Sequence, residues 1–235
     1  MYLNIFLTQP NANLLSALSE LRERIGCITL PYGCCPDELA DFPQALLCTD
    51  SRLPPDWRQK HPHAQAVFSF TPLQTEVPNI LCTPDPCNAP FVCFSLPPPD
   101  ADFFIPQGMT RHRTESLRRA LIGRNPETVT AELYLGAYAT PFPYGGSCRT
   151  LPLSEALSVA RREGTVINMN KNHYYSYFIH RNETENEAVF FLRREGFFQA
   201  VKELKALGIR RFAISAEEAA DEAVRPLLSI FEKSS

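Results

Sequence analysis

Proline marks the places where this chain of 235 residues cannot continue a helix or an interior strand. Of its 21 prolines, 16 lie at or before Pro106. Because proline has no amide donor and a fixed φ, Pro54-Pro55 and Pro97–Pro99 predict loops or sheet edges. Between such clusters stand short apolar runs, residues 45–49 and 66–70, which are typical of buried strands. The front of the chain is therefore predicted to consist of short strands with irregular connections.

Both ends of the chain alternate strand and helix patterns. Residues 2–8 are β-rich, residues 14–21 have apolar side chains at helical spacing, and residues 27–30 predict a second strand. Near the other end, residues 197–207 have helical spacing and lie between two predicted strands. This order predicts parallel βαβ units without an antiparallel meander. The predicted fold class is α/β with a mostly parallel sheet, either open or in an incomplete, barrel-like arrangement.

Charge divides the chain in the same way as proline. Residues 1–110 contain 5 Lys and Arg against 11 Asp and Glu, whereas residues 111–235 contain 18 against 15. We predict a Pro-rich acidic half, residues 1–106, and a βα-rich half, residues 107–235, which are either two lobes or one domain. The mildly acidic total, a formal charge of −3, argues against a dedicated nucleic-acid coat.

Cysteine use allows three interpretations: buried thiols, metal ligands and disulfides, of which disulfides are least favoured because no export signal is evident. Seven of the eight cysteines precede residue 94, and several lie in apolar runs, where a thiol behaves as a small hydrophobe. No C-x2-C pair is present, so no cofactor is predicted. The alternative is a zinc or iron–sulfur site, for which the most loop-like ligands are Cys34, Cys35, Cys82 and Cys87.

The loop around Cys148 is the most site-like segment. Paired glycines after an aromatic residue let a backbone approach a ligand closely, which makes Tyr144, Gly145 and Gly146 candidate binding residues. Cys148 is a candidate nucleophile, although no neighbouring base is evident. The alternative interpretation is a structural turn.

A second candidate region mixes aromatic and basic side chains. Alternation predicts Tyr175 and Tyr177 on one face of a strand, where they either stack nucleic-acid bases or form a half-buried edge strand. His173, at the start of this segment, is a candidate catalytic base. By contrast, His61 and His63 are expected to be solvated.

A basic group lies farther upstream. It contains Arg111, Arg118 and Arg119. These side chains either contact phosphate groups or RNA, or form a solvated helix face.

One motif resembles a known family. Glu132-Leu133-Tyr134-Leu135-Gly136-Ala137, followed by an aromatic–Gly turn and Gly146-Ser147-Cys148, is similar to the signature of the U32 collagenase-like peptidases. The similarity covers about residues 130–232. It implies a βα barrel and makes Glu132 and Cys148 candidate catalytic residues. Only Cys148 matches the family's four cluster cysteines, so this chain is expected to lack that cluster.

No complete catalytic constellation is evident in the sequence. We therefore predict a non-catalytic or accessory soluble protein that binds a macromolecular partner, with a protein on the acidic half and RNA or a phosphorylated ligand on the basic segment. The alternatives are a U32-like barrel enzyme or maturation factor acting on peptide or RNA, and a protein with a Cys-ligated metal or Fe–S cluster. No apolar run approaches membrane-spanning length and the start does not resemble a signal peptide, so the expected location is the cytoplasm.

Overall fold

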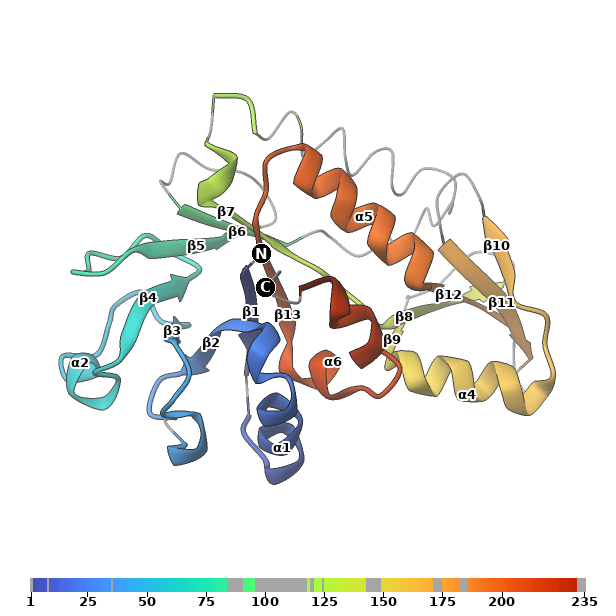
Figure 1. Cartoon of the computed structure of the whole chain (residues 1–235), viewed down its shortest axis with the longest axis horizontal. Helices are drawn as coiled ribbons and strands as arrows, with labels where there is room; N and C mark the ends of the chain where they lie inside the picture. Colours follow the sequence, from blue (N-terminus) through green and yellow to red (C-terminus); the bar gives the residue numbers. More distant parts are fainter. Residues whose placement is uncertain are drawn as a thin grey trace.

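The barrel is the central unit of the molecule. The computed structural model describes residues 2–7, 9–34, 36–83, 91–95, 118, 121–123, 125–142, 149–170, 175–181 and 186–231. Within these ranges, eight parallel strands close into a barrel, which confirms the predicted fold class (Figure 1). In barrel order they are β1 (Tyr2–Phe6), β2 (Ile25–Pro31), β3 (Gln44–Cys48), β4 (Ala64–Ser69), β5 (Asn79–Thr83), β6 (Phe91–Ser95), β7 (Val129–Glu132) and β13 (Arg211–Ser215).

Helices cover one side of this barrel. They are α1 (Ala12–Glu20), α5 (Arg194–Ala206) and α6 (Ala216–Ala220), followed by the 3-10 segment η5 (Arg225–Phe231). The outward residues of β1 and β13, such as Leu3, Ile5 and Phe212, are fully buried in the same cluster as the apolar helix residues. Among the described helices, none is long and apolar enough to cross a membrane.

Irregular connections cover the opposite side, as the proline pattern predicts. The connections of β2–β3 and β3–β4 contain only the short turns η2 (Asp37–Leu39) and α2 (Trp57–Lys60) within the described residues. Side chains from these connections and from the β4–β5 loop pack on the outer face of β3 and β4 where helices would otherwise lie; they are Tyr32, Leu53, Trp57, Leu73 and Val77.

His61 links the β3–β4 connection to the β2–β3 connection through a hydrogen bond. Contrary to the expectation of a solvated side chain, it is only 1% exposed, and its Nε2 accepts a hydrogen bond of 3.0 Å from the Gly33 amide. Burial lowers the pKa of His61, and the nearby Lys60 charge acts in the same direction. Beside it, the Tyr32 hydroxyl donates to Asp56, which also pairs with Lys60 at 3.2 Å. These contacts substitute for the missing helical packing.

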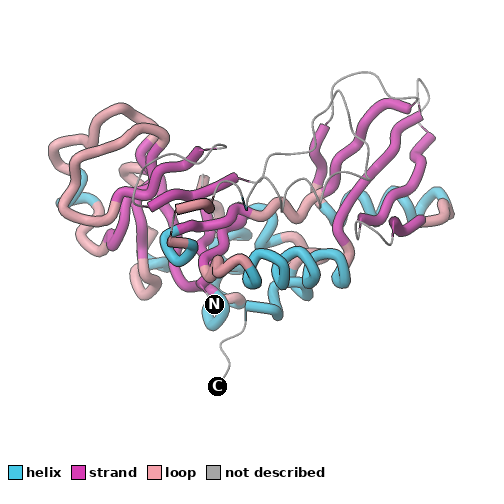
Figure 2. The backbone as a smooth tube through the Cα atoms, turned by 90° about the horizontal axis from the view of Figure 1, so that it is seen from above, coloured by secondary structure: helices cyan, strands magenta, loops and turns pink. Residues whose placement is uncertain are grey.

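A second sheet is inserted between β7 and β13. Its strands are β8 (Ala137–Phe142), β9 (Arg149–Leu151), β10 (Asn168–Asn170), β11 (Tyr175–Arg181) and β12 (Asn186–Leu192), paired antiparallel in the order β10-β11-β12-β8-β9. Helix α4 (Leu153–Glu163) packs on this sheet. Figure 2 shows that the sheet lies beside the barrel. The expectation of no antiparallel meander is wrong, because β10, β11 and β12 pair antiparallel in succession.

The predicted boundary between residues 1–106 and 107–235 lies outside the described residues. Strand β7 nevertheless pairs with β6, and β13 pairs with β1, so the barrel includes strands from both parts of the sequence.

Two acidic side chains join the inserted sheet to the barrel. Glu218 forms a capping box with Ser215 at the start of α6, and its Oε1 accepts a hydrogen bond of 2.6 Å from the Leu135 amide between β7 and β8. Three residues later, Asp221 accepts from the Ser154 amide at the start of α4, at 3.0 Å. Helix α6 therefore binds the exit from the barrel and the helix that supports the inserted sheet.

Glu218 is expected to be a major contributor to stability. In Glu218→Ala the capping box is lost and the Leu135 amide loses its acceptor, which together should lower the free energy of unfolding by about 2–4 kcal/mol. Chemical denaturation at pH 7 measures this. The matched control is Glu222→Ala, an exposed glutamate of the same region, for which a change within about 0.5 kcal/mol is expected. Equal losses in the two variants would contradict the assignment.

His61 makes the stability depend on pH. Because its pKa is lowered in the folded state, the stabilisation is present above the ordinary histidine value and is lost as the pH falls through the folded pKa. Wild type should therefore lose about 1 kcal/mol between pH 8 and pH 5 relative to His61→Gln, which keeps an acceptor for Gly33 but does not titrate. Urea melts at the two pH values measure it. The exposed His63, changed to Gln, should leave the pH dependence of wild type intact, and an identical effect of both substitutions would refute the role of His61.

Candidate functional site

Strand alternation identifies the side chains inside the barrel. In β7, Val129 and Ala131 belong to the outer core, so Thr130 and Glu132 face the interior. The register continues this row across two neighbours, because Glu132 pairs with Ala213 on β13 and Ala213 pairs with Asn4 on β1. Asn4, Ala213 and Glu132 therefore form one row on the inner wall.

Glu132 lies at the carboxyl end of β7. It is partly buried, and no hydrogen bond or ion pair joins it to another described residue. Parallel β/α barrels place their active sites at this end of the strands. The other acidic side chains nearby differ: Asp50, after β3, is exposed, and Glu218 is engaged at the α6 junction. Glu132 is thus a partly buried, inward-facing carboxyl group at the barrel's carboxyl end.

Deeper in the barrel, Asn4 and Thr29 form a polar pair. Both side chains are fully buried, and the Thr29 hydroxyl donates to Asn4 Oδ1 at 3.0 Å. The Asn4 Nδ2 group has no hydrogen-bond partner among the described residues. Buried donors are nearly always paired, so an orphan amide inside a barrel calls for an explanation.

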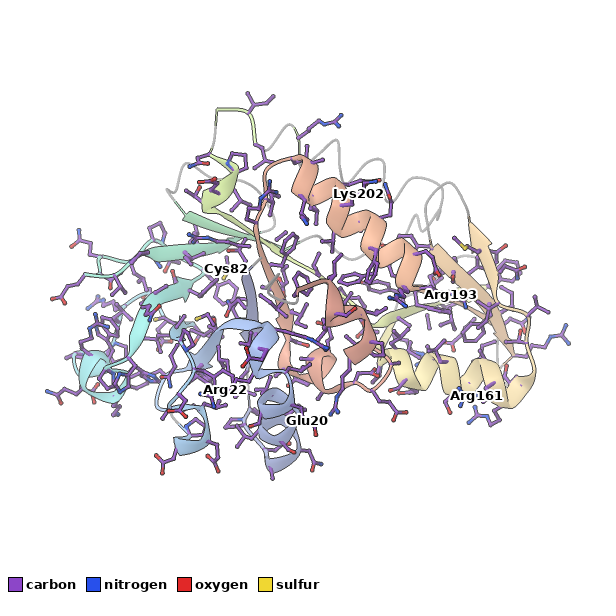
Figure 3. The ribbon with its side chains drawn as sticks, in the orientation of Figure 1. Glu20, Arg22, Cys82, Arg161, Arg193 and Lys202 are labelled. Atoms are coloured by element: carbon purple, nitrogen blue, oxygen red, sulfur yellow. The ribbon has the colours of Figure 1, made fainter. Side chains whose placement is uncertain are left out.

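The wall formed by β1–β5 is apolar. Its residues form one cluster, comprising Phe6, Cys27, Ala45, Leu47, Ala66, Phe68, Ile80 and Cys82. The rings of Phe6 and Phe68 meet edge to face, with centroids 5.1 Å apart, and Phe70 just beyond β4 is 59% exposed. Figure 3 shows the labelled Cys82 on the β5 side of the barrel. The barrel interior thus combines an apolar wall with the polar row that ends at Glu132.

The aromatic segment of the second sheet is a structural element. Tyr175 and Tyr177 share one face of β11, as alternation predicts. Tyr175 is only 3% exposed, whereas Tyr177 is partly buried with its ring centroid 5.8 Å from that of Phe190. The buried ring of Tyr175 cannot stack on a nucleic-acid base, so this part of the hypothesis is wrong.

Most of the other predicted site residues lie outside the described part of the chain. Those outside the described residues are Tyr144, Gly145, Gly146, Cys148, His173, Arg111, Arg119, Cys35 and Cys87. Arg118 is exposed.

Two of the four cysteines proposed as metal ligands, Cys34 and Cys82, belong to the described residues. Cys34 follows β2 and Cys82 lies on β5, with β3 and β4 between these strands. Burial raises the pKa of the Cys48 thiol, as expected for a structural cysteine. In the described ranges no three metal-ligating side chains come together, and the four-cysteine zinc or iron–sulfur site stays a prediction.

Asn4 and Thr29 are the residues that sequence reasoning missed. Each is a polar side chain inside an apolar β-rich run. Treating those runs as strands predicts their backbone correctly, but assigns no role to the one polar residue that faces inward. Asn4 and Thr29 could have been singled out as polar exceptions on buried strands.

Comparison with known proteins identifies solved structures with the same fold. No family model matches the chain, and no curated protein matches it. Among solved structures, the spore cortex-lytic enzyme SleL of Bacillus megaterium QM B1551 aligns with a TM-score of 0.72 at 10% identity, over 99% of this chain and 74% of that one. A chitinase from Chromobacterium violaceum aligns at 0.70 and 10% identity, over 100% and 99% of the two chains. A glycoside hydrolase family 18 N-acetylglucosaminidase from Paenibacillus barengoltzii gives 0.61 and 10%, over 98% and 99%.

These structures correct the suggested family. The similarity to U32 peptidases is wrong as an assignment, because the barrel with its inserted sheet matches chitinase-like structures instead. The motif at Glu132–Ala137 has a local explanation: Gly136 lies where the chain leaves β7, and a Cβ there would lie 2.8 Å from the Leu151 carbonyl oxygen and would clash with the Tyr134 hydroxyl. The glycine of the motif is therefore explained by the close packing at this turn and does not indicate the U32 family.

The functional expectations change with the fold. The interpretation as a non-catalytic accessory protein with a protein or RNA partner is wrong, since the structures that share this fold are described as enzymes, with chitinases and cortex-lytic enzymes among them. A class V chitinase of the same fold is described in complex with NAG4, a carbohydrate. The sequence offered no guide to this class, because identities near 10% preserve the backbone arrangement without a recognisable motif.

Proposed function

We propose that this chain cleaves glycosidic bonds of N-acetylglucosamine-containing glycans at the carboxyl end of its barrel, with Glu132 as the carboxylic acid. The observation that carries the proposal is Glu132 itself, an inward-facing carboxyl group without a partner among the described residues. Its position at the carboxyl end of a closed barrel is where such folds hold their chemistry.

The chemistry requires a proton donor that becomes a base. Protonated Glu132 gives its proton to the glycosidic oxygen as the bond from that oxygen to the anomeric carbon breaks. The carboxylate then accepts a proton from the water that adds to the anomeric carbon, which regenerates the acid.

One carboxyl group matches a particular class of substrate. Most glycosidases use two carboxyl groups, but substrate-assisted enzymes replace the second with a group of the sugar. In a 2-acetamido sugar, the acetamido oxygen attacks the anomeric carbon and water later displaces it. Solved structures of this fold carry the descriptions chitinase and N-acetylglucosaminidase, which supports this substrate class.

The two walls of the barrel suit a sugar ring. A pyranose presents hydroxyl groups at its rim and C–H groups on its faces. The exposed Phe70 and the partly buried Phe6 offer apolar surface for a face, while Glu132 offers a polar group for the rim.

The cytoplasm is retained as the proposed location. Its support is the state of Cys48 and Cys82, which are free thiols. Free thiols suit a reducing compartment.

Hydrolysis of chitotetraose and of purified spore cortex peptidoglycan tests the proposal. Wild type should release shorter products from at least one of them, and Glu132→Gln should reduce the rate at least about 100-fold, because the amide cannot transfer the proton. The matched control is Asp50→Asn, an exposed carboxylate that follows β3, which should keep the wild-type rate. A wild-type protein that cleaves neither substrate, or an active Glu132→Gln variant with an intact fold, would refute it.

A further inference from the structure

We propose that Cys82 and Cys93 are a redox-active thiol pair, which closes into a reversible disulfide between β5 and β6 when the protein meets a low-molecular-weight disulfide such as oxidised glutathione. The starting observation is the register of the barrel, in which Cys82 on β5 is the direct partner of Cys93 on β6. The proposal concerns thiol chemistry, so it does not depend on the proposed cleavage of glycans.

The two positions lie within the span of a disulfide. Neighbouring strands are about 4.8 Å apart, and the Cα atoms of a disulfide are usually about 4.4–6.8 Å apart. Register partners present their Cβ atoms to the same face of a sheet, so the positions of Cys82 and Cys93 share one face. The bond therefore requires no change in strand pairing.

The face that these positions share is the inside of the barrel. Cys82 packs against the interior cluster that contains Cys27, Phe68 and Ile80. On the concave inner surface of a closed barrel, the Cβ atoms of register partners converge and lie closer together than their Cα atoms. A disulfide needs this convergence, because its Cβ atoms are only about 3.5–4.5 Å apart. The same register on the outer face would separate the two Cβ atoms.

Cys82 is placed to meet the oxidant first. It is a free thiol, partly exposed, and lies one residue before the carboxyl end of β5. By contrast, Cys27 and Cys48 are each only 3% exposed. The Cys48 thiol also donates to the carbonyl oxygens of Asp50 and Arg52, as expected for a structural cysteine. Reactivity towards a dissolved disulfide follows access and thiolate character, so exposure favours Cys82.

The exchange proceeds in two balanced steps. The Cys82 thiolate attacks one sulfur of oxidised glutathione, whose S–S bond breaks, and this leaves a mixed disulfide and one glutathione thiolate. The Cys93 thiolate then attacks the Cys82 sulfur, the mixed S–S bond breaks, and the second glutathione thiolate leaves. Two protein thiols are oxidised, one glutathione disulfide is reduced, and the two protons pass from the protein thiols to the released glutathione.

The register also places this pair close to the candidate carboxyl group. Strand β6 pairs with β7, where Cys93 is the partner of Thr130, two residues before Glu132. A mixed disulfide on Cys82 would leave a tripeptide attached at the barrel interior, whereas the internal disulfide adds no atoms. A second cysteine in register therefore keeps oxidation of Cys82 small and reversible.

Peptide mapping after oxidation tests this proposal. Fully reduced wild type is incubated with oxidised glutathione at pH 7, alkylated and analysed by mass spectrometry. It should lose two free thiols and yield a linked peptide that joins Cys82 to Cys93, and dithiothreitol should restore both thiols. In Cys93→Ala no thiol resolves the first step, so Cys82 should accumulate as the glutathione mixed disulfide. Cys82→Ala should form neither product.

The matched control is Cys34→Ala, which removes another partly exposed thiol and should form the Cys82–Cys93 link at the wild-type rate. Thermal melts of each reduced variant check its fold, and the wild-type map decides the question even where a variant does not fold. The proposal is overturned if wild type keeps both thiols, if a mixed disulfide on Cys82 is its final product, or if Cys82 bonds to a different cysteine. All of these results are read from the thiols, so they are independent of glycan cleavage.

Discussion

The Glu218 carboxylate accepts hydrogen bonds from the Ser215 amide and hydroxyl and from the Leu135 amide, and the relative placement of the two sheets depends on it. Burial raises the pKa of this group, whereas the backbone donors act in the opposite direction. A carboxylate in this environment is tolerated because each of its oxygens meets a backbone N–H group. Glu218 caps the start of α6, directly after β13, and also binds the Leu135 amide after β7. The contacts that attach the inserted sheet are therefore made by the same side chain that connects the last two strands of the barrel.

The row of residues at the candidate site is formed only when the barrel closes. Asn4 belongs to the first strand, Ala213 to the last, and Glu132 to the strand before it, so the row forms only when β13 pairs with both β1 and β7. Strand period then determines the chemistry: each residue of the row is flanked along its strand by apolar residues that face outward into the core, among them Leu3, Ile5, Ala131 and Phe212. A slip of one residue in any of the three strands would exchange core and interior side chains.

The sequence allowed the parallel βα character to be predicted, because Leu14, Leu18 and the 197–207 segment have clear helical spacing beside β-rich runs. Proline also correctly indicated the irregular connections that cover β3 and β4. The buried state of His61 could not be predicted, since it depends on Gly33, 28 residues away, as its donor. Glu132 was selected through a family similarity that the fold does not support, and its inward direction follows only from its register with Ala213. Periodicity describes each strand separately, whereas a site composed across strands requires the register between them.

The barrel interior shows how a site can be recognised when no sequence motif marks it. Stability alone would favour apolar residues throughout, as on the wall around Phe6 and Phe68. Departures from that rule are concentrated on β1, β2 and β7, where Asn4 has an orphan donor and Glu132 has no partner among the described residues. One of these groups is deep and can only donate, while the other is near the carboxyl end and can give or take a proton. Contacts among the described residues explain neither group, and Glu132, which is only partly buried and lies at the carboxyl end, is the one that a ligand can reach.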